Sequence, residues 1–174
     1  FQHFGLLPHR KVIDNIAYVR LNRPDKLNAL TLTTLEQLVS TARTLSKDRT
    51  LRAVIITGNG DSFCAGLDFA SVLKQPANIA KTFLPRPWRG TNTFQEACWA
   101  WRRVPVPVIA AVHGHCLGGG VQIALGADFR FATPDSTWSV LESKWGLIPT
   151  HIRIGYKGTS GRQGIIPAGT DSCN

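Results

Sequence analysis

Two β-branched runs in this chain each end at a glycine-bearing turn, and a helix-forming stretch follows. Residues 51–57 (LRAVIIT) end at Gly58, and residues 106–112 (VPVIAAV) end shortly before Gly114. Short β-branched runs bounded by turn residues predict buried strands. Because buried strands that alternate with helices are typical of parallel sheets, this order predicts an α/β fold.

Other segments continue the alternation. Residues 16–22 (IAYVRLN) alternate apolar and polar side chains, which predicts a strand. Apolar residues at helical spacing predict an amphipathic helix over 33–47, with Thr33 as N-cap and Glu36 completing a capping box. The remaining predicted elements are a short helix near 68–74, a helix at 94–103 capped by Thr93, a helix at 118–126 and a strand at 128–132.

Composition favours one compact globular domain, because 43% of the 174 residues are hydrophobic and only 18% are charged. No apolar run approaches the ~20 residues that span a bilayer, and the first residues lack the layout of a secretory signal. The cysteines form no CxxC pair, so we expect reduced thiols and a cytoplasmic location. They are Cys64, Cys98, Cys116 and Cys173.

The net charge of +9 has two interpretations. Scattered basic residues are usually a solvated surface, but they also suit an anionic partner. Nucleic acid would fit the charge as well as a phosphate-bearing small molecule does. Because Lys and Arg are spread along the chain rather than gathered in a block, the charge alone does not decide between these classes.

Two glycine-bearing motifs follow predicted strands. Residues 63–68 (FCAGLD) precede a short helix, where small residues let the backbone approach a ligand and a helix start leaves N–H groups free; an ordinary strand-to-helix turn would look the same. Residues 114–122 (GHCLGGGVQ) place three glycines at a helix start. Either the backbone there contacts a ligand, or the glycines permit close packing against a strand. Neither GxxxxGK[ST] nor GxGxxG occurs there.

A third motif, residues 138–149 (WSVLESKWGLIP), holds Glu142 among apolar neighbours. Burial would raise the pKa of such a carboxyl and suit it to proton transfer, although a surface glutamate is the simpler interpretation.

Other groups of candidate site residues give weaker signals. His113, His115 and Cys116 lack a further ligand cluster, so no metal site is predicted, and Cys64 lacks an evident base. The aromatic residues Trp88, Phe94, Trp99 and Trp101 favour a core or a pocket wall over a base-stacking platform.

Together with residues 20–30 (RLNRPDKLNAL), the three motifs in this order resemble the crotonase superfamily, the enoyl-CoA hydratase/isomerase family. The resemblance runs from about Ile16 to Pro149. It implies an α/β fold of the ClpP/crotonase type, a crotonase-like spiral of ββα turns, as the core domain over residues 1–149. Residues 150–174 do not resemble the family's C-terminal helices, so we expect an irregular tail and a C-terminus that is truncated or altered.

The resemblance also implies an oxyanion hole for a thioester enolate, formed by the backbone N–H groups of Leu67 and Gly119. Leucine replaces a frequent alanine there, which an N–H donor tolerates, and its side chain is expected to narrow the acyl pocket. The positions that match the substrate and coenzyme A channel are Lys26, Leu27, Ala29, Ala65, Leu67, Asp68, Phe69, Ala70 and Gly119.

One carboxylate of the family's hydratase pair is missing. Hydratases of the family hold water between two glutamates, and the aligned positions here are Gln122 and Glu142. Gln122 can hydrogen-bond water but cannot take its proton. A single glutamate favours isomerase-like or other enolate chemistry, in fatty-acid or related acyl-CoA metabolism.

The resemblance implies no permanently bound cofactor, with coenzyme A arriving as part of an acyl-CoA substrate. It implies a homotrimer or hexamer if the C-terminus is intact, and neither a membrane nor nucleic acid is favoured as partner. The alternative is a non-catalytic or remnant crotonase domain that binds acyl-CoA, a partner subunit or RNA. The missing glutamate, the unusual tail and the charge of +9 keep that alternative open.

Overall fold

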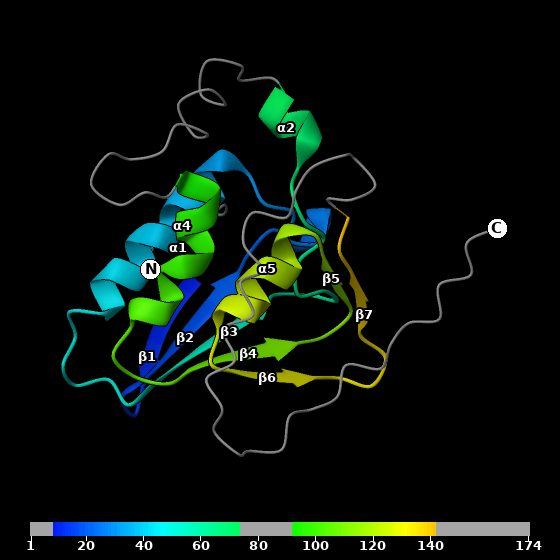
Figure 1. The fold of residues 1–174 in the computed structure, drawn as a ribbon. Helices are drawn as coiled ribbons and strands as arrows, with labels where there is room; N and C mark the ends of the chain where they lie inside the picture. The colour runs from blue at the N-terminus through cyan, green and yellow to red at the C-terminus, as the bar shows by residue number, and fades with distance from the viewer. Residues whose placement is uncertain (1–8, 74–91, 142–174) are drawn as a thin grey trace.

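A five-stranded, mostly parallel sheet forms the centre of the computed structural model, which describes residues 9–73 and 92–141 (Figure 1). The strand order is β1-β2-β3-β4-β6. β1 pairs antiparallel with β2, and the other neighbours are parallel. The strands are β1 (His9–Ile13), β2 (Ile16–Leu21), β3 (Ala53–Gly58), β4 (Val108–Val112) and β6 (Phe129–Ala132).

A small second sheet joins β5 (His115–Leu117) to β7 (Thr137–Ser139) in parallel. β5 directly precedes the glycine triplet, so this sheet fixes the approach of the chain to that turn. The carbonyl oxygen of Ser139, at the end of β7, accepts a hydrogen bond of 2.8 Å from the Gly118 amide.

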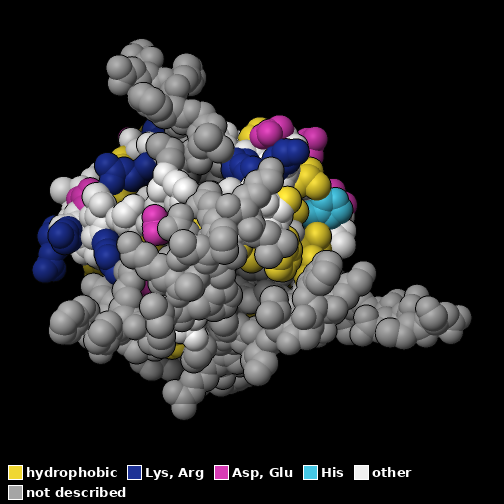
Figure 2. Space-filling model, turned by 90° about the horizontal axis from the view of Figure 1, so that it is seen from above, with side chains coloured by type: hydrophobic (Ala, Val, Ile, Leu, Met, Phe, Trp, Pro, Cys, Tyr) yellow, Lys and Arg dark blue, Asp and Glu magenta, His cyan; other side chains and the backbone are white. Residues whose placement is uncertain are grey.

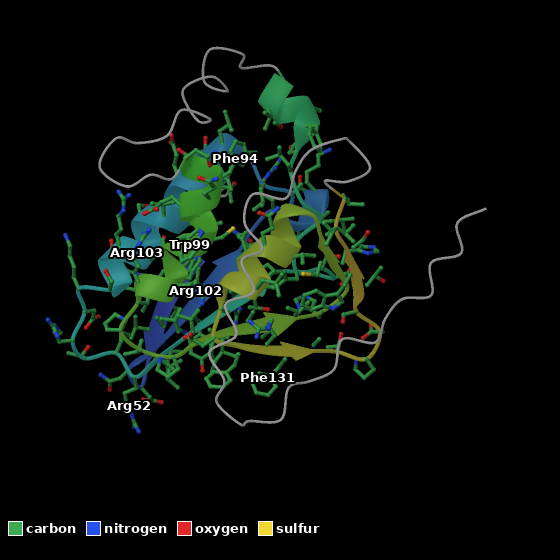
Figure 3. The ribbon with its side chains drawn as sticks, viewed as in Figure 1. Arg52, Phe94, Trp99, Arg102, Arg103 and Phe131 are labelled. Atoms are coloured by element: carbon green, nitrogen blue, oxygen red, sulfur yellow. The ribbon has the colours of Figure 1, made fainter. Side chains whose placement is uncertain are left out.

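Helices α1, α4 and α5 lie on the same side of the large sheet (Figure 1). Strand residues such as Val54, Ile56 and Val108 are fully buried beneath them. On the opposite side Phe131 is 66% exposed, and Figure 3 shows it directed away from the helices. The helices of the described part are α1 (Leu32–Leu45), α2 (Phe69–Leu73), α4 (Thr93–Trp99) and α5 (Gly119–Gly126), with 3₁₀ turns at Pro24–Lys26 and Trp101–Arg103.

The predicted cap of α1 was wrong by two residues. Thr31 is the N-cap: its backbone is extended, and its hydroxyl accepts a hydrogen bond from the Thr34 amide at 3.1 Å. Thr33 lies inside the first turn and is exposed. A hydroxyl caps only from the residue whose own backbone is still outside the helix, and that condition is met at Thr31.

The predicted cap and end of α4 were also wrong. Asn92 caps the helix and exchanges reciprocal hydrogen bonds with Gln95, which forms a capping box. The α-helix ends at Trp99, and a 3₁₀ turn replaces its predicted last residues. Val104 precedes a proline and has an extended backbone (ψ 127°), so the chain must leave helical geometry before it.

The other predicted elements within the described residues are present, with small shifts at their ends. The predicted strand at 106–112 begins at Val108, because Pro107 has no N–H for the ladder. Strands β1, β5 and β7 were not predicted. The predicted irregular stretch 75–90, the tail 150–174 and the domain division at residue 149 lie outside the described residues. None of the helices in the described part is long and apolar enough to cross a membrane.

Basic side chains do not form one block on the face seen in Figure 2, where Lys and Arg stand at several separate places. Among the predicted aromatic cluster, Trp101 is fully buried in the core and Phe94 packs against the core. The Arg102 guanidinium lies 5.3 Å from the ring centre of Trp99 (Figure 3). Trp88 lies outside the described residues. The core interpretation therefore holds for Trp101.

Candidate active site

The two glycine-bearing motifs lie side by side, although about fifty residues separate them in the chain. Phe63 donates its amide hydrogen to the His113 carbonyl oxygen at 2.8 Å, and Cys64 donates to His115 at 2.8 Å. Leu117 donates back to the Cys64 carbonyl at 2.9 Å. These bonds make a short parallel ladder. The two predicted donor residues therefore follow neighbouring, hydrogen-bonded stretches of backbone.

Glycine is required where the two motifs touch. Gly66 has φ +92°, and a Cβ there would lie 3.0 Å from the Leu117 carbonyl oxygen. A Cβ on Gly120 would lie 2.7 Å from the Cys64 carbonyl oxygen and 2.8 Å from the Cys64 Cβ. The close-packing interpretation of the triplet is thus correct for Gly120. At Gly119 an added Cβ would meet only the flexible end of Leu30, at 3.0 Å.

Among the residues that the structure describes, the pairing of its neighbours leaves the Leu67 amide without a hydrogen-bond partner. Leu30 donates to the Gly66 carbonyl at 2.7 Å, and Asp68 donates to the Leu30 carbonyl at 2.9 Å. In a parallel bridge these flanking groups face the partner strand, so the N–H of the central residue faces the other way. Within residues 9–73 and 92–141, the Leu67 N–H donates no hydrogen bond.

The Gly119 amide also lacks an acceptor among the described residues, for a different reason. Gly119 is the first residue of α5, and the first bond of that helix runs from the Gln122 amide to the Gly118 carbonyl at 3.3 Å. The N–H groups that precede that bond have no intrahelical acceptor. Gly118 offers no side-chain cap. In the part of the chain that the structure describes, the Gly119 N–H therefore has no acceptor.

The loop that holds Lys26, Leu27 and Ala29 packs against the first motif. Ala65 donates to the Leu27 carbonyl at 2.9 Å. Leu27 and Asn28 have left-handed backbone, with φ 46° and 56°. The buried Asn28 side chain fixes this turn by donating to the carbonyl oxygens of Asn59 and Ser62 at 2.8 and 2.7 Å. Sequence reasoning missed Asn28, although asparagine is one of the few residues besides glycine that often adopt such backbone.

Asp68 lies at the entry to α2, where it accepts two bonds from Ser71: from the amide at 3.0 Å and from the hydroxyl at 2.7 Å. Arg23 donates to the same carboxylate at 3.1 Å. The Ser71 hydroxyl and amide, together with the Arg23 guanidinium, hold the pKa of Asp68 below its usual value despite the opposing effect of burial. Phe69 and Ala70 begin the exposed first turn of α2.

Of the predicted pair Gln122 and Glu142, only Gln122 lies within the described residues. Gln122 lies in the first turns of α5 and is 9% exposed, three residues after Gly119. Glu142 lies outside the described residues, so its distance from Gln122 and its predicted role are untested. The structure brings together residues 26–29, residues 65–70 and the start of α5.

Cys64 and Cys116 face each other across an isolated bridge, and both are fully buried. Burial raises the pKa of the Cys64 thiol to about 12 and also raises the pKa of Cys116. Both thiols are protonated at neutral pH, which does not favour a nucleophilic role.

The described residues contain no cluster of three His, Cys, Asp or Glu side chains that could hold a metal ion. The His113 ring contacts the Gly60 carbonyl at 2.9 Å.

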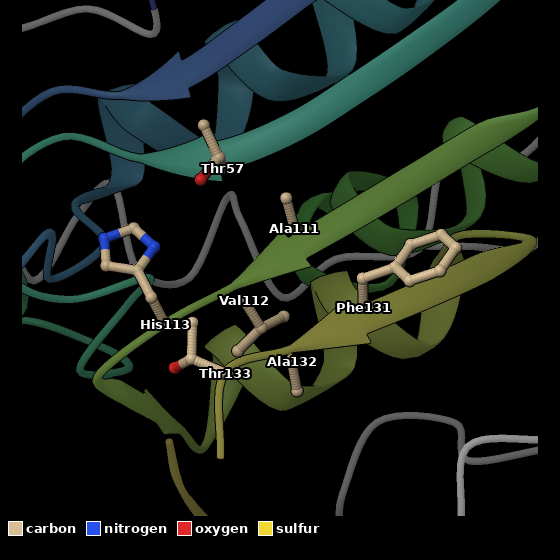
Figure 4. Close-up of a pocket in the computed structure, with 7 residues that line it drawn as sticks. All are labelled: Thr57, Ala111, Val112, His113, Phe131, Ala132 and Thr133. Carbon is tan, nitrogen blue, oxygen red and sulfur yellow. The ribbon is translucent and has the colours of Figure 1, made fainter. Parts of the chain in front are cut away.

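A separate shallow depression of about 260 Å³ lies at the carboxyl ends of β3, β4 and β6 (Figure 4). Its lining is mostly apolar, and it contains none of the predicted site residues. It is lined by Thr57, Ala111, Val112, His113, Phe131, Ala132 and Thr133. We therefore place the candidate site at the paired motifs, where two unpartnered N–H groups occur.

Comparison with known proteins gives the same assignment as the motifs. A sequence model described as Enoyl-CoA hydratase/isomerase matches residues 11–158. The chain is 35% identical over 137 residues to Delta(3,5)-Delta(2,4)-dienoyl-CoA isomerase of Mus musculus, and the match covers 76% of this chain and 42% of that protein. It is 28% identical to hydroxycinnamoyl-CoA hydratase-lyase of Pseudomonas fluorescens, with 82% and 51% covered.

Solved structures share the fold. An enoyl-CoA hydratase from Bacillus anthracis matches with a TM-score of 0.69 and 27% identity, covering 82% of this chain and 53% of that one. One from Mycobacterium avium subsp. paratuberculosis matches with a TM-score of 0.70 and 26% identity, covering 86% and 55%. The predicted α/β fold of crotonase type is therefore confirmed, and the chain spans about half the length of the relatives it matches. This chain belongs to the enoyl-CoA hydratase/isomerase family.

Proposed function

We propose that this chain acts on acyl-CoA thioesters and stabilises an enolate between the N–H groups of Leu67 and Gly119. One observation carries the proposal: the ladder between residues 63–64 and 113–117 brings the two motifs together. Within the described residues, the Leu30–Leu67 bridge and the start of α5 leave the N–H groups of Leu67 and Gly119 without an acceptor. Two such donors beside each other are what a developing oxyanion requires.

The proposed reactions place negative charge on the thioester carbonyl oxygen that these donors would bind. Removing a proton from the carbon next to a thioester carbonyl, or adding a nucleophile to a 2-enoyl thioester, moves negative charge onto the carbonyl oxygen. N–H groups that are already oriented stabilise that charge without reorganisation. Losing one donor of this kind typically costs about 2.7–4 kcal/mol of transition-state stabilisation.

Glu142 is proposed to move the proton and Gln122 to orient water or substrate. Gln122 is nearly buried on α5, close in sequence to the Gly119 donor. A glutamine can donate and accept hydrogen bonds but cannot take a proton, so one carboxylate remains. This favours isomerisation over hydration, and the similarity to a dienoyl-CoA isomerase is consistent with that preference.

The loop 26–29 and residues 65–70 are proposed to line the channel for coenzyme A and the acyl chain. Lys26 is exposed on this loop and is suited to a phosphate group of the coenzyme. A trimer or hexamer, a cytoplasmic location and a role in fatty-acid or related acyl-CoA metabolism complete the proposal. The oligomeric state and the metabolic role rest on the family resemblance, and the location rests on the expected reduced cysteines.

Turnover of 2-enoyl-CoA and 3-enoyl-CoA by the full chain tests the proposal. Glu142→Gln should abolish both activities, whereas Glu36→Gln on the exposed side of α1 should leave them unchanged. Gln122→Glu should raise hydration relative to isomerisation. If Glu142→Gln retains full activity, Glu142 has been assigned the wrong role. Binding of acyl-CoA without any turnover would favour the non-catalytic alternative.

A further inference from the structure

Arg23 joins the two loops that flank the Leu67 donor. One guanidinium nitrogen, Nη1, donates to the Ala29 carbonyl oxygen at 2.7 Å. The other, Nη2, donates to the Asp68 carboxylate at 3.1 Å. Ala29 and Asp68 are next in sequence to Leu30 and Leu67, which form the isolated bridge. The planar fork of one side chain therefore spans the bridge that sets the direction of the Leu67 N–H.

Both ends of this contact are held in place. The Arg23 amide donates to the Asn28 side chain at 2.8 Å, and the Arg23 carbonyl accepts from the Lys26 and Asn28 amides at 3.0 and 2.9 Å. Asp68 is held in turn by Ser71. The Arg23 and Asp68 side chains are only 14% and 15% exposed, so water screens their attraction less than at an open surface.

We infer that Arg23 is a positioning residue for the Leu67 oxyanion donor: its guanidinium holds the 23–30 loop against Asp68 and so orients the Leu67 N–H. The inference rests on the proposed function, because it names the residue that orients one of the two donors. Arg23 acts through Asp68 and the Leu30–Leu67 bridge and needs no contact with the thioester.

The bonds around Leu67 explain why Arg23 should matter more than an ordinary surface cation. The bridge itself consists of only two backbone bonds, from Leu30 to Gly66 and from Asp68 to Leu30. α2, which follows Asp68, is only five residues long. Together with these two bonds and the bond from Ala65 to the Leu27 carbonyl, the contact of Arg23 with Asp68 holds residues 65–68 against the 23–30 loop. A small rotation of one peptide would turn the N–H away from the substrate oxygen, and misplacement by about 1 Å can lower a rate ~100-fold.

The test compares Arg23→Gln and Arg23→Lys with Arg103→Lys as a matched control. Arg103 also makes a forked contact, to Glu96 at 2.7 and 3.0 Å, but it joins α4 to the 3₁₀ turn away from the bridge. Two quantities are measured. The residual dipolar coupling of the Leu67 amide reports the direction of its N–H without any substrate. The infrared carbonyl band of crotonyl-CoA, labelled with ¹³C at the thioester carbon, reports how strongly the donors polarise the bound thioester.

We expect Arg23→Gln to change the Leu67 coupling, to leave the Gly119 coupling unchanged and to reduce the carbonyl shift. Its kcat should fall by roughly 10- to 100-fold with a smaller change in KM. Arg23→Lys should lie between the wild type and the glutamine variant, because an ammonium group cannot reproduce the fork. Arg103→Lys should change neither quantity.

An unchanged Leu67 coupling in folded Arg23→Gln would overturn the inference. If that variant does not fold, Asp68→Asn replaces it. Asparagine can still accept from the Ser71 amide and donate to the Ser71 hydroxyl, while the bond and the charge attraction to Arg23 are lost. An unchanged coupling there has the same meaning. Failure of the proposed function looks different. The wild-type chain itself would then leave the carbonyl band unshifted, and the positioning role would fall with it.

Discussion

Gly120→Ala should destabilise the protein, whereas Gly119→Ala should leave its stability nearly unchanged. Both positions lie at the start of α5, where alanine would otherwise be the better helix former by up to about 1 kcal/mol. A Cβ at position 120 would lie 2.7 Å from the Cys64 carbonyl oxygen and 2.8 Å from the Cys64 Cβ. At position 119 the contact within the described residues is a terminal methyl group of Leu30, at 3.0 Å.

The two variants should differ in stability because different atoms must move to make room for the new Cβ. Backbone at Cys64 is held by the ladder to residues 115 and 117, so Gly120→Ala must shift α5 or break that ladder. Overpacking of this kind costs about 1–3 kcal/mol, which exceeds the gain in helix propensity. For a chain of this size, each kilocalorie per mole lowers Tm by roughly 2–4 °C. An alanine at 119 requires only a few tenths of an ångström of movement by the terminal methyl group of the buried Leu30 side chain, with no shift of backbone.

Thermal unfolding followed by circular dichroism, at matched protein concentration, measures the difference. We expect a fall in Tm of roughly 2–8 °C for Gly120→Ala and of less than about 2 °C for Gly119→Ala. Equal Tm values for the two variants would refute the argument, because they would mean that the Cys64 backbone does not constrain the helix start. If Gly119→Ala is as stable as the wild type but polarises the thioester carbonyl less, the donor role of that position gains direct support.

Three further predictions concern the caps and the charged groups. Thr31→Ala should lower the free energy of unfolding in urea by about 1 kcal/mol, and Thr33→Ala by much less, since only Thr31 caps α1. Arg103→Met should cost about 1.5–3 kcal/mol in the same assay, because it removes two charge-assisted hydrogen bonds from the fully buried Glu96 carboxylate and leaves it the longer contact with Arg43, at 3.5 Å. Glu96→Met should cost less, because an apolar side chain of similar size leaves no buried charge. The lowered pKa of Asp68 means that its charge stabilises the fold above the unfolded value of ~3.9. That contribution is lost as pH falls through the lower folded value, so the wild type should lose stability faster than Asp68→Asn in an acid titration.

The elements predicted from the sequence were those whose signals are local. The β-branched run that became β3 and the apolar stripe of α1 needed no distant partner to be recognised. Strands β5 and β7 are three residues each and exist only because they pair with one another, so their sequences carry little signal. The predicted cap positions were wrong for a similar reason. Thr31 and Thr33 are the same residue type, and only the backbone conformation distinguishes them.

The proposed donor residues were predicted from the resemblance, but the contacts around them could not be predicted. Nothing in the sequence pairs residue 23 with residue 68, or residue 28 with the carbonyl groups at 59 and 62. These are long-range contacts between loops, and periodicity and turn rules describe only neighbours along the chain. The paired cysteines show the same limit. Cys64 and Cys116 belong to different motifs, and only the fold makes them neighbours.

Packing and chemistry impose one common requirement on the two motifs. A side chain at position 66 or 120 would push the segments apart, and the Leu67 and Gly119 donors would separate with them. The ladder that stabilises this contact uses the amides of residues 63, 64 and 117, and the bridge to Leu30 uses that of residue 68. Within the described residues, the amides of Leu67 and Gly119 are left without an acceptor by this arrangement. A substitution that loosens the contact should therefore lower stability and weaken thioester polarisation together.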